Sequence, residues 1–239
     1  MISKLITFYL LFYDNSVNLF SYADENKDKT MPTNIVVVRA SHGIPMINYL
    51  KSVSAPLPYL LAQVALSEDL FENPDNLIPE HTLYALLENA SLLLDMPDIG
   101  FKMTEQLSLD NYGTFGAEVM EKETLNDALL TFIATMGEQS NCPPFWLAQG
   151  DGCVWFCRIG SQGLKQGHWQ VEQHVVSLMS ELVRSYTSAK WTPPFVYFQT
   201  NTLKGIETAN SLINTRINSN MPITAVCIPN TCLNSAKLT

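Results

Sequence analysis

The sequence has few charged residues and no cluster of lysine or arginine. Asp, Glu, Lys and Arg make up only 15% of its 239 residues, and the formal net charge is −9. Phosphate backbones repel a chain with this sign of charge, so we expect this chain to make no direct contact with nucleic acid. Hydrophobic residues make up 46%, which indicates a folded globular protein rather than a disordered one.

The sequence also lacks the signatures of several enzyme classes. It has no GxxxxGK[ST] loop, no GxGxxG following a strand and no GxSxG nucleophile elbow. Its four histidines stand alone, without a second ligand at metal spacing. The carboxylates between residues 118 and 127 are best explained as a solvated helix face and a cap. We therefore expect no enzyme: no catalytic residues, no metal and no cofactor.

Cysteines and long apolar runs are scarce as well. The five cysteines form an odd set without regular spacing, which favours reduced thiols in a cytoplasmic protein over a disulfide framework. The apolar run at residues 5–13 is too short to span a bilayer, so we expect no membrane contact. With Ser21-Tyr22-Ala23 it is compatible either with a signal peptide or with an extension upstream of Met31. We favour the extension and a cytoplasmic location.

The pattern of hydrophobic residues changes near residue 140. Residues 1–34 read as an N-terminal extension or mobile arm, and 35–239 as one domain. Helical periodicity dominates 44–138, whereas 141–232 contains strand-like segments around a long amphipathic helix. Hairpins are predicted at 145–158 and 212–229. The predicted fold class is α+β: a helical N-terminal half followed by a largely antiparallel sheet backed by the long helix.

The first hairpin and the long helix supply candidate ligand-binding residues. With a two-residue turn at Asp151-Gly152, the two tryptophans of the hairpin share one face of the sheet and Arg158 lies on the other, whereas a three-residue loop would shift the pairing by one and swap these partners. The tryptophans form either ordinary core or a wall for stacking a ligand, and Arg158 pairs either with an acid of the protein or with an anionic ligand. His174 borders the buried stripe of the long helix, as a core residue or as a polar group facing a cavity. The candidate ligand-binding set is Trp146, Trp155, Arg158, His174 and Tyr197.

The stretch NYGTFGAEVMEKETLNDALLTF, residues 111–132, places two glycines before an amphipathic helix. Each glycine costs about 1 kcal/mol relative to alanine in a helix interior. We therefore interpret Gly113 and Gly116 as a packing device that lets a neighbouring segment approach closely. Thr124 is the predicted N-cap of the next helix, Asp127 stands in capping-box position, and Gly137 is predicted to end the helix.

The order of these segments resembles the N-terminal effector-sensing domain of AraC/XylS-type transcription regulators, of the arabinose-binding-domain type. The likeness runs from about residue 44 to 238 and is carried by four stretches: LFENPDNLIPEHTLYALLENA, YGTFGAEVMEKETLNDALLTF, WTPPFVYFQT and AVCIPNTCLNSAKL. The family label does not establish the sugar as ligand. This chain departs from the pattern at Gln199 and Thr200, where relatives commonly carry a histidine.

The resemblance implies a ligand-sensing and dimerising domain that controls an attached DNA-binding domain. We expect a homodimer and a small organic effector bound in an apolar cavity between the helical half and the sheet. A fatty or aromatic acid, an amino-acid derivative and no effector at all are the alternatives, and the apolar lining favours an amphipathic acid. The helix-turn-helix domain of such regulators is absent from this chain, so we expect DNA contact only through that domain, in an excised or truncated product. The alternative is a protein-interaction module, a truncated regulator that pairs with a full-length partner and needs no small ligand.

Overall fold

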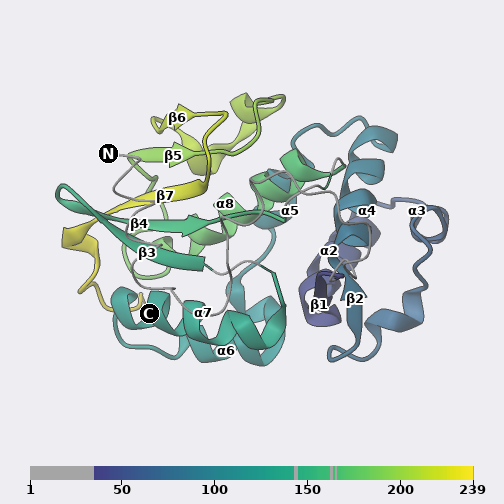
Figure 1. Cartoon of the computed structure of the whole chain (residues 1–239), viewed down its shortest axis with the longest axis horizontal. Helices are drawn as coiled ribbons and strands as arrows, with labels where there is room; N and C mark the ends of the chain where they lie inside the picture. Colours follow the sequence, from purple (N-terminus) through teal and green to yellow (C-terminus); the bar gives the residue numbers. More distant parts are fainter. Residues whose placement is uncertain (1–34, 143–144, 162–163, 165, 239) are drawn as a thin grey trace, which may run out of the picture.

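The computed structural model describes residues 35–142, 145–161, 164 and 166–238, so the predicted N-terminal extension lies outside the described residues. The predicted α+β class is confirmed, because a helical half precedes a mostly antiparallel sheet with a long helix. Figure 1 shows the sheet at one end of the molecule, α2 to α4 at the other, and α8 running between them. Among the described residues, no helix has both the length and the hydropathy needed to cross a bilayer.

The helical half is built from three helices and a small sheet. Strand β1 (Val37–Arg39) pairs antiparallel with β2 (Leu77–Pro79), and the helices are α2 (Ala40–Ser52), α3 (Leu57–Gln63) and α4 (Glu80–Leu93). The predicted helical periodicity begins at residue 44, but the first helix already starts at Ala40. The amides of Ala40 and Ser41 donate to the carbonyls of Asn76 and Pro74, at 2.7 and 3.0 Å, and these distant contacts hold the extra turn.

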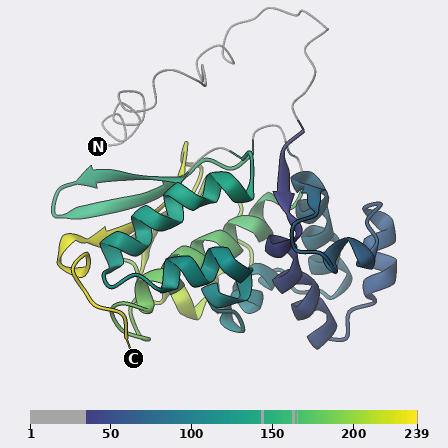
Figure 2. The same cartoon turned by 90° about the horizontal axis from the view of Figure 1, so that it is seen from below.

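Three further helices connect this half to the sheet: α5 (Ile99–Glu105), α6 (Gly113–Met120) and α7 (Leu125–Gln139). Helices α6 and α7 lie side by side (Figure 2). The Thr124 hydroxyl accepts a hydrogen bond from the amide of Asp127 at 3.2 Å, which satisfies an open donor at the start of α7. The predicted end at Gly137 is wrong, since α7 continues to Gln139; a glycine inside a helix costs stability without ending it.

Glycine suits the two positions before α7 for different structural reasons. A Cβ added to Gly116 would lie 1.7 Å from the carbonyl oxygen of Leu109, so α6 packs directly on the preceding 3₁₀ turn (Leu109–Tyr112). Gly113 has open space around its Cα, and its φ of +66° is a left-handed conformation that glycine adopts without strain. The close approach that we inferred for both glycines is thus present only at Gly116.

The sheet has the strand order β3-β4-β7-β5-β6. Strands β3 (Phe145–Gly150) and β4 (Cys153–Arg158) form the predicted hairpin, with Ala148 opposite Trp155 as a two-residue turn requires. Strand β7 (Thr224–Pro229) pairs antiparallel with both β4 and β5 (Phe195–Tyr197).

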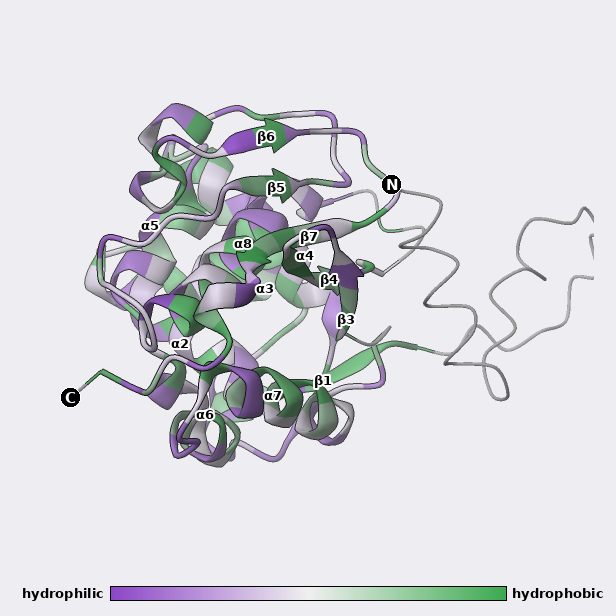
Figure 3. Ribbon diagram, turned by 90° about the vertical axis from the view of Figure 1, so that its left-hand side faces the viewer, coloured by the Kyte–Doolittle hydropathy of each residue, from purple (hydrophilic) through white to green (hydrophobic). Residues whose placement is uncertain are grey.

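The predicted second hairpin is wrong. Strand β6 (Arg216–Asn218) pairs parallel with β5, which separates it from β7. Strand β7 is almost entirely buried and so needs a partner along both edges, whereas the short polar β6 suits the edge of the sheet. Figure 3 shows polar residues at both ends of β6 and hydrophobic ones along the neighbouring β5.

Helix α8 (His168–Arg184) packs against α4, α5 and β7, and joins the two halves. The half-buried Val175 near its middle contacts both hydrophobic clusters: one around α2 to α4, the other between α6, α7 and the inner face of the sheet. Glu172 of α8 ties the helix to the sheet, because its carboxylate accepts from the amides of Gln199 and Thr200, at 2.8 and 2.9 Å, and from the hydroxyl of Thr224.

Candidate functional site

A cavity of about 120 Å³ lies where the helical half, α7, α8 and the sheet meet. All its lining residues are buried or half-buried. Most of the wall is apolar: Val38, Met46, Leu83, Leu87, Phe115, Phe132, Met136, Phe145, Val171, Val175, Leu178 and Met179. The polar lining residues are His42, Glu80, Tyr84, Tyr112, Ser140, Cys142, Arg158 and His174. A mostly apolar wall with a few convergent polar groups is typical of a small-molecule site.

One side of the cavity holds a buried ion pair. Arg158, at the end of β4, lies 3.7 Å from the carboxylate of Glu80, the first residue of α4, and also donates to the Tyr84 hydroxyl at 2.8 Å. Glu80 accepts further hydrogen bonds from the Cys142 thiol, at 2.8 Å, and from the Ser161 hydroxyl. The carboxylate therefore has several donors as well as a cation, which is what a buried charge requires.

The Cys142 thiol beside this pair is not poised as a nucleophile. Burial and the neighbouring Glu80 carboxylate raise the pKa of Cys142 to about 12. Burial likewise raises the pKa of Tyr84 to about 12. Both groups stay protonated near neutral pH, so they serve as hydrogen-bonding groups of the wall rather than as reactive anions.

His174, near the middle of α8, has both ring nitrogens engaged. Nδ1 lies 2.8 Å from the Thr104 hydroxyl, and Nε2 lies 2.8 Å from the Tyr112 hydroxyl. Because Thr104 gives its one hydrogen to the carbonyl of Gly100, Nδ1 of His174 must be the donor and Nε2 accepts from Tyr112. Burial, together with His42 and Arg158, lowers the pKa of His174 to about 3, which agrees with this neutral ring.

His42, in the first turn of α2, is the contrasting case. Its Nε2 atom is buried and has no hydrogen-bond partner among the described residues. The rings of Tyr112 and Phe115 flank it at centroid distances of 5.6 and 5.5 Å. Burial lowers the pKa of His42 to about 4, so this ring is also neutral at pH 7. A buried polar atom without a partner is costly, and here it lines a cavity.

The structure divides the predicted ligand-binding residues into two groups. Arg158 and His174 both line the cavity. The other three, Trp146, Trp155 and Tyr197, belong to a separate cluster on the opposite face of the sheet, where the rings of Trp155 and Tyr197 stack at 4.5 Å. Side chains alternate between the two faces of a strand, so the tryptophans cannot reach the cavity that Arg158 lines.

Sequence reasoning missed the cavity residues that come from the helical half. His42 stood before the predicted start of its helix, which left it outside the helical pattern. Glu80 had a readable signal, because it is an acid directly after the Ile78-Pro79 pair that opens an apolar helix. No group of three or more His, Cys, Asp or Glu side chains within the described part of the chain is arranged to hold a metal ion.

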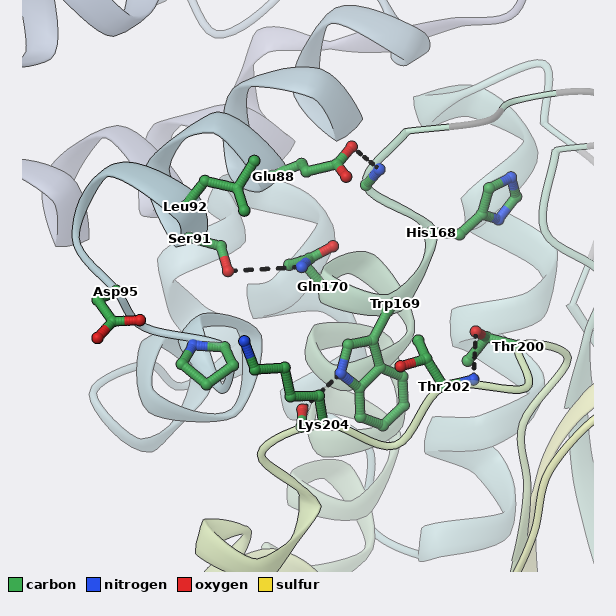
Figure 4. Close-up of a pocket in the computed structure, with 12 residues that line it drawn as sticks. Glu88, Ser91, Leu92, Asp95, His168, Trp169, Gln170, Thr200, Thr202 and Lys204 are labelled. Carbon is green, nitrogen blue, oxygen red and sulfur yellow. Dashed lines mark hydrogen bonds between the residues drawn. The ribbon is translucent and has the colours of Figure 1, made fainter.

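A second pocket, of about 300 Å³, lies between the end of α4, the start of α8 and residues 200–204 (Figure 4). Its polar groups bond mainly to each other: Glu88 accepts from the amide of Gly167 at 2.7 Å, and Trp169 donates to the carbonyl of Lys204 at 2.7 Å. Several of its lining side chains are exposed, including Asp95 and Lys204. The central cavity, with its buried or half-buried and mostly apolar lining, is therefore the stronger candidate for a specific small-molecule site.

Residues 56–236 match the family described as the arabinose-binding domain of AraC transcription regulators, N-terminal part. The fold is similar to the crystal structure of the transcriptional regulator CdpR from Pseudomonas aeruginosa, with a TM-score of 0.58 and 13% sequence identity. The likeness covers 89% of this chain and 59% of that one, and at this identity it concerns the fold alone. No curated protein matches the sequence significantly.

Proposed function

The chain belongs to the family of arabinose-binding domains found at the N-terminus of AraC transcription regulators, and on this premise we propose that it senses a small organic effector in the central cavity. The observation that carries the proposal is the cavity itself, a mostly apolar space at the junction of the two halves, lined among others by His42, whose Nε2 is buried without a partner among the described residues. Effector binding there would control an attached DNA-binding domain.

The packing around the C-terminal segment supports a route for this control. Residues 233–238 bond to the ends of two of the helices that line the cavity. The amide of Leu125, at the start of α7, donates to the carbonyl of Ser235 at 3.1 Å, and the amide of Leu238 donates to that of Ser185, just after α8, at 2.9 Å. Met136, on the cavity wall, lies eleven residues along α7 from Leu125, about 16 Å of helix. A small shift of α7 or α8 on ligand binding would therefore reach the C-terminal segment.

Native mass spectrometry of the purified full chain tests the proposal. The chain should carry a small molecule that is released on denaturation, and Val175→Phe, which fills the cavity, should abolish the co-purified mass. Val171→Phe serves as a second filling variant, and Leu130→Phe, on the exposed side of α7, is the matched control that should retain the ligand. Retention of the ligand in both filling variants would place the site elsewhere.

We also propose that the chain forms a homodimer, as its resemblance to the regulators implies. Sedimentation equilibrium should give twice the mass of one chain, with or without ligand. A monomer at every concentration would contradict this part of the proposal. An empty chain that runs as a clean dimer would favour the alternative, a module that pairs with a full-length regulator and needs no small ligand.

A further inference from the structure

We infer that the effector is a compact, uncharged ring compound with one hydrogen-bonding group, of the phenol class, and that this group pairs with Nε2 of His42. The inference rests on the proposed function, because it names the ligand chemistry of the same cavity. It replaces the amphipathic acid expected from the sequence. Three features of the cavity lead to it: its charges, its open polar atom and its size.

The charges of the cavity wall already balance each other. Arg158 is the cationic side chain of the lining, and it is held by Glu80 and by the Tyr84 hydroxyl. An incoming carboxylate would have to compete with Glu80 for Arg158, and one of the two anions would then stay buried without a cation. The two histidines of the wall, His42 and His174, offer no positive charge either, because burial lowers the pKa of both rings well below neutrality. A carboxylate ligand is therefore disfavoured.

One polar atom of a lining residue still lacks a hydrogen-bond partner. The Nε2 of His42 is buried without a partner among the described residues, whereas both nitrogens of His174 are engaged. A neutral imidazole nitrogen can accept from a hydroxyl or donate to its oxygen, depending on the tautomer. A ligand with a single hydroxyl would satisfy this atom. A pentose would bury several hydroxyls for which the described lining offers no matching set of open partners.

The size and the wall of the cavity favour a single ring. An engineered apolar cavity of about 150 Å³ takes up benzene, and the cavity here measures about 120 Å³ before any adjustment of its lining. Phe115, Phe132 and Phe145 lie in the wall, and aromatic edges and faces pack well against a second aromatic ring. A long acyl chain would exceed this space.

Titration calorimetry of the full chain at pH 7 with toluene, phenol and benzoate tests the inference. Phenol should bind about tenfold more tightly than toluene, as expected for one buried hydrogen bond, and benzoate more weakly than either. His42→Leu should remove the advantage of phenol but keep toluene binding, whereas His81→Leu, an exposed histidine of α4, should behave as the wild type. His42→Gln, which keeps a hydrogen-bonding group, should retain part of the preference and serves as the readout if His42→Leu does not fold.

Benzoate binding as tight as phenol would overturn the inference, as would a phenol advantage that survives in His42→Leu, or failure of all three probes to bind. None of these outcomes decides the proposed function, which depends on the co-purified ligand and its loss in the cavity-filling variants. The inference about the ligand class and the proposal of a sensing role can thus be refuted separately.

Discussion

Replacing Arg158 by methionine should destabilise the fold by about 3–5 kcal/mol, because it leaves the Glu80 carboxylate buried without its cation. Both side chains are nearly inaccessible, with 6% and 8% exposure for Arg158 and Glu80. In the variant the Ser161 hydroxyl and the Cys142 thiol would still donate to Glu80. These neutral donors cannot offset a buried negative charge, so most of the penalty should remain.

A double-mutant cycle separates the charge from the packing. Glu80→Gln keeps an acceptor for Ser161 and Cys142 but removes the charge, so the double variant Glu80→Gln/Arg158→Met should lose only about 1–3 kcal/mol, from the unpaired polar groups that remain. It should therefore be more stable than Arg158→Met alone. Urea unfolding of the full chain at pH 7, followed by tryptophan fluorescence, gives the free energies, provided that the m-value is unchanged. A loss below about 1 kcal/mol in Arg158→Met, or a double variant no more stable than that single variant, would refute the reasoning.

The remaining predictions concern acid sensitivity, packing and capping. The folded-state pKa values of about 4 for His42 and about 3 for His174 lie below the ordinary 6.5, so the unfolded chain takes up both protons first. Stability is then full well above pH 6.5 and should fall by about 2.4 kcal/mol per pH unit between pH 6 and 4.5 from these groups; His42→Gln should roughly halve this slope in urea titrations, and an unchanged slope would contradict the pKa assignment. Gly116→Ala should cost about 3 kcal/mol, because its Cβ meets a backbone carbonyl, whereas Gly137→Ala, with open space in α7, should stabilise by about 0.5–1 kcal/mol; equal effects in thermal unfolding would count against the packing argument. Thr124→Ala should cost about 1 kcal/mol through loss of the cap, and no change in melting temperature would mean that the cap is replaced.

Local signals made parts of the fold predictable from the sequence. Asp151-Gly152 is a favoured pair for a two-residue turn, and it set the register of the β3–β4 hairpin correctly. Thr124 and the apolar stripe that follows it correctly predicted the start of α7, because a cap and its helix are close in sequence.

The parts of the fold and of the site that were predicted wrongly, or not predicted at all, depend on contacts between residues that are distant in sequence. Strand β6 was assigned to β7, its neighbour along the chain, because nothing local shows that β5 would lie between them. The cavity combines contacts such as His174 to Thr104 and Arg158 to Tyr84, over 70 and 74 residues. Arg158 and His174 could be suspected one by one, but their common site required the packing of α4 and α8 against the sheet.

Methionine methyl groups offer the most direct test of the central claim, that the cavity at the junction of the two halves binds the effector. Met46, Met136 and Met179 line the cavity, whereas Met221 packs on the opposite face of the sheet and Met96 stands between Asp95 and Pro97, two residues of the second pocket. In ¹³C-methyl NMR of the full chain with toluene, phenol and benzoate, any probe that binds should shift the resonances of Met46, Met136 and Met179 and leave Met221 and Met96 unchanged. Shifts confined to Met221 or Met96 would contradict the account.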